Sequence, residues 1–130
     1  MIHTPAFVLD ASELLALLQR EEGALAVEGV VPASCISALN LSEVVAKMRE
    51  RSWKELETTE ALYALNLDVR DFKLEDALRS GHLRIATKRL GLSLGDRACL
   101  ALALELGCPV LTTDRAWAKL DIGVEVKLVR

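Results

Sequence analysis

The sequence predicts an α/β protein built on a mainly parallel sheet. Short strand-like runs alternate with helical segments along the chain, which is the pattern produced when helices cross over between parallel strands. The 130 residues are 52% hydrophobic and 27% charged, which provides apolar material for the core of one domain spanning residues 1–130. No internal repeat, low-complexity stretch or linker rich in Pro, Gly and Ser interrupts the sequence.

The first half of the chain predicts two strands, each followed by helix. The first strand is a short apolar run that ends at Asp10, and the second carries Pro32 near its start. The helix after the second strand is the best marked, because apolar residues recur at i, i+3, i+4 and i+7 from Leu41 to Met48. The predicted strands are residues 6–9 and 30–36, and the predicted helices are residues 12–19, 41–48 and 53–65.

The second half continues the alternation. Residues 98–106 are apolar almost all round, so this helix is expected to be buried, and Gly107 and Pro109 are typical of a helix end. Gly81 lowers the helical propensity of the segment before it. The predicted helices are residues 74–90, residues 98–106 and a short one containing Trp117 and Leu120; the predicted strands are residues 68–72, 110–112 and 124–129.

Composition excludes several classes of protein. The longest unbroken apolar run, residues 98–104, is far shorter than the roughly 20 residues that span a bilayer, so no membrane segment is expected. The N-terminus has no basic segment before an apolar stretch, which argues against a secretory signal. The three cysteines are odd in number and lack C-x-x-C spacing, which predicts reduced thiols in a cytoplasmic protein rather than a disulfide framework or a zinc site.

The net charge of −3, from 16 basic and 19 acidic residues, disfavours a protein that binds nucleic acid through bulk charge alone. If four acids serve one site, the remainder is 16 basic against 15 acidic residues. That remainder is compatible with local patches that bind a polyanion.

Four acidic residues that lie far apart in the sequence fall at one edge of the predicted sheet. In a parallel sheet the carboxyl ends of the strands and the N-termini of the following helices share an edge, where ligands bind. We therefore expect one crevice lined by four carboxylates. They are Asp10 and Asp114 after strands, Glu43 in the first turn of the helix that follows the second strand, and Asp96 at the start of the buried helix.

Each acid also has a purely structural interpretation as a helix cap. The N-x-x-E pattern at residues 40–43 and the S-x-x-D pattern at residues 93–96 match capping boxes, and the other two acids could cap the helices after them. Clustered carboxylates, however, repel one another and are costly when partly buried unless a cation compensates. Oxygen ligands without a nearby histidine suit Mg²⁺ or Mn²⁺ and do not suit zinc.

Four segments in this order resemble the PIN-domain ribonucleases, and most of all the small VapC-like toxins of VapBC toxin–antitoxin systems. The resemblance covers nearly the whole chain, and the last two segments in tandem are the most specific. The segments are VLDASELLALL at residues 8–18, ALNLSEVV at residues 38–45, LSLGDRACLALALELG at residues 92–107 and PVLTTDRAW at residues 109–117.

The resemblance implies a three-layer fold with four to five central strands and a catalytic metal site formed by Asp10, Glu43, Asp96 and Asp114, with Thr112 in support. The implied activity is hydrolysis of RNA phosphodiesters with Mg²⁺ or Mn²⁺, which leaves 5′-phosphate products and needs no side-chain nucleophile. The implied partners are an RNA substrate, a cognate antitoxin protein and a second copy of the chain in a homodimer.

The residues that would bind the substrate are less clearly marked. Arg97 and Arg115 each follow a site acid directly and could reach backbone phosphates, or could form ordinary surface charge or an ion pair with a site carboxylate. Basic residues at 47, 49, 51 and 54 form either a solvated helix face or a path for RNA or a partner. Apolar residues between positions 45 and 65 belong either to the core or to a dimer interface.

Three other functions compete with a ribonuclease. A PIN-like module could bind RNA or protein without catalysis and use its acids only structurally. A phospho-accepting receiver domain needs adjacent acids after the first strand, where Ala11 and Ser12 follow Asp10. A haloacid-dehalogenase phosphatase needs D-x-D at the same place, where the third residue is Ser12.

Overall fold

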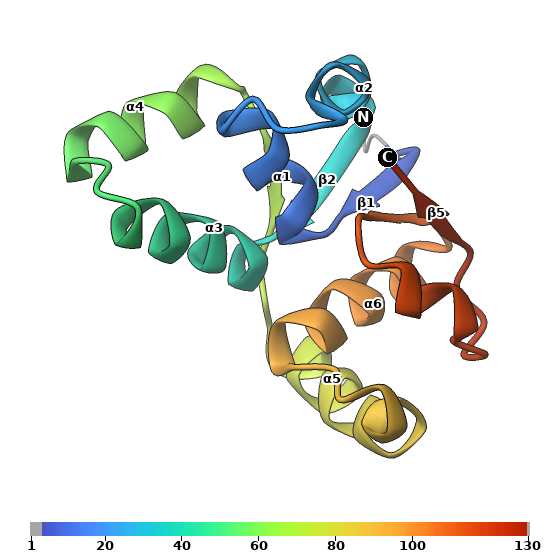
Figure 1. Ribbon diagram of the computed structural model, residues 1–130. Coiled ribbons are helices and arrows are strands. Elements are labelled where there is room, and N and C mark those ends of the chain that lie inside the picture. Colours follow the sequence, from blue (N-terminus) through green and yellow to red (C-terminus); the bar gives the residue numbers. More distant parts are fainter. Residues whose placement is uncertain (1–3, 130) are drawn as a thin grey trace.

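Five parallel strands form the central sheet of the computed structural model, which describes residues 4–129 (Figure 1). Their order is β3-β2-β1-β4-β5, so the two earliest strands lie at the centre beside β4. The predicted α/β class with a parallel sheet is confirmed. The strands are β1 (Phe7–Leu9), β2 (Ser34–Ser37), β3 (Asp68–Arg70), β4 (Val110–Thr112) and β5 (Val126–Leu128).

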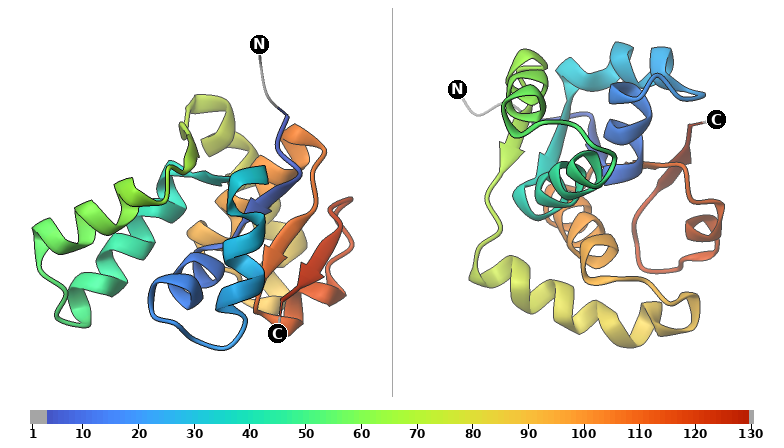
Figure 2. Two further views of the ribbon diagram at one scale, coloured as in Figure 1. Left: turned by 90° about the horizontal axis from the view of Figure 1, so that it is seen from above. Right: turned by 60° about the vertical axis from the view of Figure 1, so that its left-hand side comes forward.

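Helices cover both faces of this sheet and complete three layers (Figures 1 and 2). Helices α5 and α6 pack together on one face, while α1, α2 and α3 cover the other and α4 packs on α3. The α-helices are α1 (Ala11–Leu18), α2 (Ala24–Val30), α3 (Ala38–Glu50), α4 (Glu55–Ala64), α5 (Leu74–Thr87) and α6 (Leu94–Leu106); short 3₁₀ turns are η1 (Val31–Ala33), η2 (Lys88–Leu90) and η3 (Arg115–Lys119). Within residues 4–129, none of these helices has the length and apolar character needed to cross a membrane.

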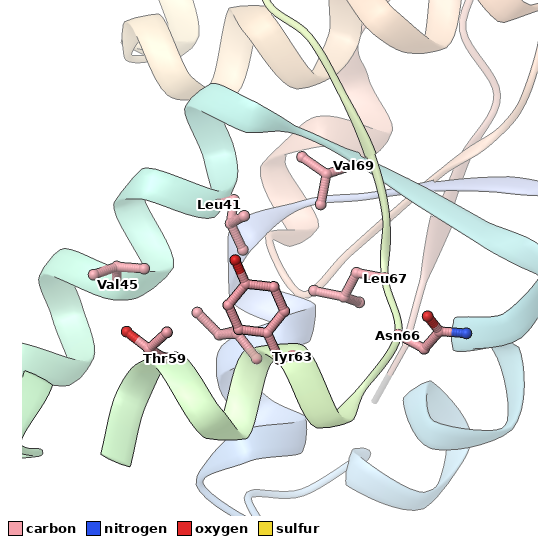
Figure 3. A pocket seen from close by; sticks show the side chains of 8 residues that line it. Leu41, Val45, Thr59, Tyr63, Asn66, Leu67 and Val69 are labelled. Carbon is pink, nitrogen blue, oxygen red and sulfur yellow. The ribbon is translucent and has the colours of Figure 1, made fainter. Parts of the chain in front are cut away.

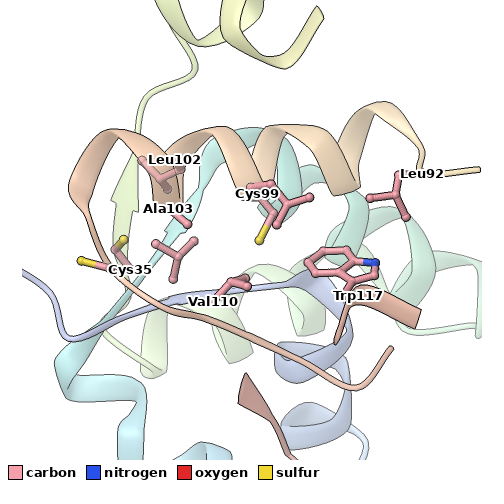
Figure 4. Packing of buried hydrophobic residues seen from close by; sticks show 10 residues of the cluster. Cys35, Leu92, Cys99, Leu102, Ala103, Val110 and Trp117 are labelled. Atoms are coloured by element: carbon pink, nitrogen blue, oxygen red, sulfur yellow. The ribbon is translucent and has the colours of Figure 1, made fainter. Parts of the chain in front are cut away.

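The core divides into two clusters because successive side chains of a strand point to opposite faces. In β1, Val8 joins the cluster beneath α6 and Leu9 joins the cluster beneath α1 and α3. Around the α6 cluster, Trp117 of η3 and Cys99 of α6 are fully buried against the sheet (Figure 4). All three cysteines are buried and free.

The prediction of a second strand at residues 30–36 is wrong at its start. Residues 24–30 form α2, which the sequence reading missed, and Pro32 lies in the 3₁₀ turn before β2 begins at Ser34. Val27 and Val31, four residues apart, are both buried in the core. Burial of one helical face therefore overrides the strand preference of these β-branched residues.

Other boundaries differ by a few residues. Helix α6 begins at Leu94, before the apolar run at 98–106, and the capping box predicted at Ser93 and Asp96 is confirmed; the helix ends where Gly107 takes a left-handed φ of 66°. Gly81 does not interrupt α5, which runs unbroken from Leu74 to Thr87. The predicted helix at 12–19 is confirmed with a shift of one residue, because α1 spans Ala11–Leu18, and the helix at 53–65 and the strands at 6–9, 68–72 and 124–129 are confirmed with shorter ends.

Candidate active site

Asp10, Glu43, Asp96 and Asp114 line one depression of about 450 Å³ at the carboxyl edge of the sheet. Asp10 directly follows β1, Asp114 lies two residues beyond β4, and Asp96 lies in the first turn of α6. The topology thus gathers the four acids that the sequence places at this edge. Their roles as ligands or catalysts stay a prediction. The other lining residues are Ala11, Ser12, Leu15, Lys47 and Thr113.

Asp10 is the most buried of the four acids and the most fully hydrogen-bonded. Its Oδ1 accepts from the backbone N–H of Ala11 at 2.8 Å, and its Oδ2 accepts from the hydroxyls of Ser12 at 2.8 Å and Thr112 at 2.9 Å. Burial raises the pKa of Asp10 to about 6 against these hydrogen bonds, and the negative charge of Asp96 adds to the rise. This site therefore resists a further negative charge unless a cation is present.

Thr112 connects two of the acids. Its hydroxyl donates to Asp10 Oδ2 and accepts from the backbone N–H of Asp114 at 3.0 Å, and its side chain is fully buried. Thr112 therefore holds the ends of β1 and β4 in a fixed relation beneath the depression.

Glu43 is held in a way that the capping-box interpretation of residues 40–43 did not foresee. Ser37, not Asn40, is the N-cap of α3, so Glu43 lies in the second turn rather than the first. The buried Asn40 donates from Nδ2 both to Glu43 Oε1 at 2.9 Å and to the carbonyl of Gly95 at 2.8 Å. Asn40 thereby ties the Glu43 carboxylate to the first turn of α6.

Gly95 leaves the space that the Glu43 side chain occupies. A Cβ atom added at Gly95 would collide with the Glu43 carboxylate. Any larger residue at position 95 must therefore displace this carboxylate or the start of α6.

Three of the acids also act as helix caps, as their structural interpretation predicts. Asp10 caps α1, Asp96 Oδ2 accepts from the Ser93 backbone N–H at 2.9 Å, and Asp114 Oδ1 accepts from the Ala116 backbone N–H at 3.0 Å. A cap and a site ligand are therefore compatible roles for the same carboxylate, since a carboxylate has two acceptor oxygens.

The depression fits a hard divalent cation by its chemistry more than by its present geometry. Its acidic lining offers oxygen donors only, which Mg²⁺ and Mn²⁺ prefer. Among residues 4–129, however, no group of three or more His, Cys, Asp or Glu side chains is arranged to enclose an ion. One oxygen of each of the Asp96 and Asp114 carboxylates accepts a hydrogen bond at a helix end, which leaves the other oxygen of each for an ion.

Neither arginine predicted to bind substrate lines the depression. Arg97 Nη1 donates to the carbonyl of Ser80 on α5 at 3.0 Å, so its guanidinium lies between α5 and α6. Arg115 is exposed at the start of η3. Among the described residues, the basic residue that lines the depression is Lys47, which belongs to the cluster that the sequence predicts as either a solvated helix face or a path for RNA or a partner. Its spacing of four residues from Glu43 was the available signal.

A second hollow, which we call the apolar groove, lies between α3, α4 and β3 and has a volume of about 530 Å³ (Figure 3). Tyr63 extends from α4 towards Leu41 of α3 and remains 81% exposed. Part of the 45–65 segment is thus neither core nor ordinary polar surface. The lining residues are Leu41, Val45, Thr59, Leu62, Tyr63, Asn66, Leu67 and Val69.

Comparisons with known proteins agree with this architecture. Residues 7–123 match the family model described as the PIN domain. A search of curated proteins finds no significant match.

Solved structures of low sequence identity share the fold. One is VapBC2 from Rickettsia felis bound to a DNA fragment from their promoter, with a TM-score of 0.73, 16% identity and coverage of 94% of this chain and 97% of the other. A second is DNA-bound VapBC from Salmonella typhimurium, with a TM-score of 0.70, 20% identity and coverage of 97% and 99%. A third is a toxin-antitoxin complex from Klebsiella pneumoniae, with a TM-score of 0.70, 22% identity and coverage of 91% and 98%.

Proposed function

The chain belongs to the PIN domain family, and from this premise we propose that it is a metal-dependent endoribonuclease that serves as the VapC-like toxin of a toxin–antitoxin pair. The observation that carries this proposal is the single depression lined by Asp10, Glu43, Asp96 and Asp114, whose carboxylates come from four separate segments of the chain. PIN domains are generally nucleases, and the solved structures of similar fold include toxin–antitoxin complexes.

The four carboxylates would hold the metal, with Asp10 as its central ligand. When bound, Mg²⁺ or Mn²⁺ supplies the positive charge that activates water and shields the phosphate. Asp96 and Asp114 would complete the oxygen donor set with the carboxylate oxygens that do not accept a hydrogen bond at a helix end. Thr112 supports the site by fixing Asp10 and the backbone of Asp114.

Glu43 orients the attacking water and accepts its proton. Its Oε1 is held by Asn40, which fixes the carboxylate at the side of the depression. The water oxygen attacks phosphorus, the bond to the 3′ oxygen breaks, and the 5′ phosphate stays on the downstream product. The N-terminus of α6, at which Asp96 lies, adds a partial positive charge that favours the phosphate.

A non-catalytic PIN-like module that binds RNA or protein is the second candidate. Two observations favour it: among residues 4–129 no three acidic side chains are arranged to enclose an ion, and three of the four acids cap helices. In that case the acids would have only their structural role.

Paired substitutions at Asp96 separate the two candidates. Asp96→Asn keeps an oxygen that can accept from the Ser93 backbone N–H but removes the charge. We therefore expect RNA cleavage in Mn²⁺ to fall by at least about 10²-fold, the scale of a lost catalytic group. The melting temperature in chelator should be equal or higher, because the repulsion between Asp96 and Asp10 is relieved. Asp96→Ala also loses the cap and should lower stability by about 0.5–2 kcal/mol. The measurements are cleavage of a labelled RNA pool and thermal melting.

Retention of wild-type cleavage by the Asn variant would contradict a metal-ligand role for Asp96. A wild type that neither cleaves RNA in Mn²⁺ nor melts at higher temperature with it would favour the non-catalytic module. The melting shift is expected because an ion that binds only the folded state stabilises it.

The proposed protein partners are an antitoxin and a second copy of the chain. The apolar groove supports an antitoxin contact, because it exposes Tyr63 and Val69 beside half-buried apolar residues and similar folds occur in toxin–antitoxin complexes. A homodimer is proposed from the family resemblance alone. A cytoplasmic location is supported by three free cysteines that are all buried.

A further inference from the structure

One basic side chain lines the depression together with the four acids. Lys47 lies on α3 four residues after Glu43, and side chains four residues apart share one face of a helix. Among the described residues that line this depression, Lys47 alone has a basic side chain. We propose that Lys47 is a substrate-binding residue whose ammonium group contacts an RNA phosphate beside the bond to be cut. This inference rests on the nuclease function proposed above.

The ammonium group of Lys47 is available for an anion from solution. Lys47 is exposed, and the ion pairs found within residues 4–129 do not include it. The carboxylates of the depression thus lie more than 4.0 Å from its ammonium nitrogen, although they line the same hollow. Lys47 therefore enters the site as an unpaired positive charge at its rim.

Neighbouring arginines have other contacts. Arg49 Nη1 donates to the carbonyl of Trp53 at 3.0 Å, Arg51 pairs with Glu21 at 3.7 Å, and Arg97 donates to Ser80. Each of these guanidinium groups would have to give up a contact before it could meet RNA. Lys47 would not, which distinguishes it from the other basic residues of α3.

The charge balance of the depression gives Lys47 a specific task. A single dication neutralises only half of the formal charge of four ionised carboxylates, and each phosphodiester brings a further negative charge. Lysine provides a compact positive charge on a flexible stem, which suits contact with a phosphate whose base is not read. Lys47 would therefore strengthen binding of any RNA strand at the site without selecting its sequence.

The test measures RNA binding apart from cleavage. Binding is measured in chelator by titrating a short fluorescent oligouridylate with each protein over a series of NaCl concentrations. The proteins are wild type, Lys47→Ala, Lys47→Arg and Lys54→Ala. The KM and kcat of RNA cleavage by the same proteins are measured separately in Mn²⁺. Lys54→Ala is the matched control, because Lys54 carries the same charge in the same basic cluster but does not line the depression.

We expect Lys47→Ala to raise the Kd at low salt roughly fivefold, the scale of an exposed charge contact, and to reduce the slope of log Kd against log salt by about 0.7. KM should rise in parallel while kcat stays unchanged. Lys47→Arg should restore most of the affinity, and Lys54→Ala should behave as wild type.

The outcomes separate this inference from the proposed nuclease function. A wild type that cleaves RNA while Lys47→Ala keeps its Kd, KM and salt slope overturns the role of Lys47 alone. A wild type that binds the oligouridylate through Lys47 but never cleaves RNA overturns the nuclease function alone. An equal loss of RNA affinity in Lys54→Ala would assign the effect to net charge and would overturn the role of Lys47. A wild type that shows no measurable binding at low salt would also overturn this role.

Discussion

The acidic depression and the apolar groove lie on different faces of one helix. Glu43 and Lys47 of α3 line the depression, whereas Leu41 and Val45 line the groove. The two pairs are offset by two residues, which turns a side chain by about 200° around the helix axis. Helix α3 therefore separates a polar hollow from an apolar one.

The two hollows differ in how their side chains are held. In the depression, Asp10 and Glu43 accept hydrogen bonds from buried or partly buried partners, so their positions are set before any ligand arrives. In the groove, Tyr63 and Val69 are 81% and 39% exposed, and covering them would remove apolar surface from water at about 25 cal/mol per Å². These differences agree with the proposed roles of the two hollows, the first as a catalytic site and the second as a contact for a protein partner.

The largest expected effect tests whether RNA cleavage depends on the position of the Glu43 carboxylate in the depression. Gly95→Ala places a Cβ where the Glu43 carboxylate lies, and because that carboxylate ends a flexible side chain it should swing away. We expect RNA cleavage to fall by about 10²-fold, as for loss of an acid–base group, without loss of stability, since Ala favours helix over Gly. Cleavage rates and thermal melting measure the two effects.

Gly81→Ala is the control for this substitution. Gly81 lies in α5 with no atom near the added Cβ, so the variant should gain about 0.5–1 kcal/mol of stability and cleave RNA as wild type does. Wild-type activity in Gly95→Ala would mean that the position of Glu43 does not matter for cleavage.

A smaller effect should separate the groove from the depression. Tyr63→Asp introduces a charge into the proposed antitoxin contact and should weaken that complex by about 30-fold, the scale of a lost aromatic anchor, while RNA cleavage by the isolated chain is unchanged. Binding is measured with the small protein encoded immediately upstream, which is the expected position of an antitoxin gene.

Leu56→Asp provides the matched control for the groove. Leu56 is also an exposed apolar residue of α4, at 67% exposure, but does not line the groove. Equal weakening by both variants, or loss of cleavage in Tyr63→Asp, would show that the groove is not a separate binding surface.

The smallest expected effect is the pH dependence of the metal-free protein. Burial raises the pKa of Asp10 from 3.8 to about 6, so the folded state holds a proton that the unfolded state has lost between these values. The stability associated with this proton is fully present below about pH 4 and is lost as pH rises through about 6. The loss in the free energy of unfolding at neutral pH is at most about 2–3 kcal/mol. Asp10→Asn should therefore melt several degrees above wild type at pH 7.5 in chelator and show little difference near pH 4. A melting difference that does not change with pH would contradict this cause.

Local sequence patterns anticipated much of the fold because they reflect local physics. The apolar repeat from Leu41 to Met48 follows the helical period, and Ser93 and Asp96 form their capping box within one turn of helix. Parallel topology then places Asp10 and Asp114 at the same edge, so their proximity follows from the alternation of strands and helices.

The sequence reading failed where distant packing decided the outcome. Residues 24–30 became α2 because Val27 is buried against the core, although the β-branched residues beside it favour a strand. Arg97 follows a site acid in sequence, yet its side chain reaches Ser80 on α5 instead of the depression.

The sequence by itself determined the α/β alternation, the segments that carry the four acids and the family resemblance, because each depends on spacing along the chain. Only the tertiary structure decided that Asn40 joins Glu43 to Gly95, that Lys47 belongs with the acids, and that α3 separates two unlike hollows. The physical reason is that such contacts join residues as far apart as 55 positions, as Asn40 and Gly95 are, and form only when β1, β2 and α6 pack together.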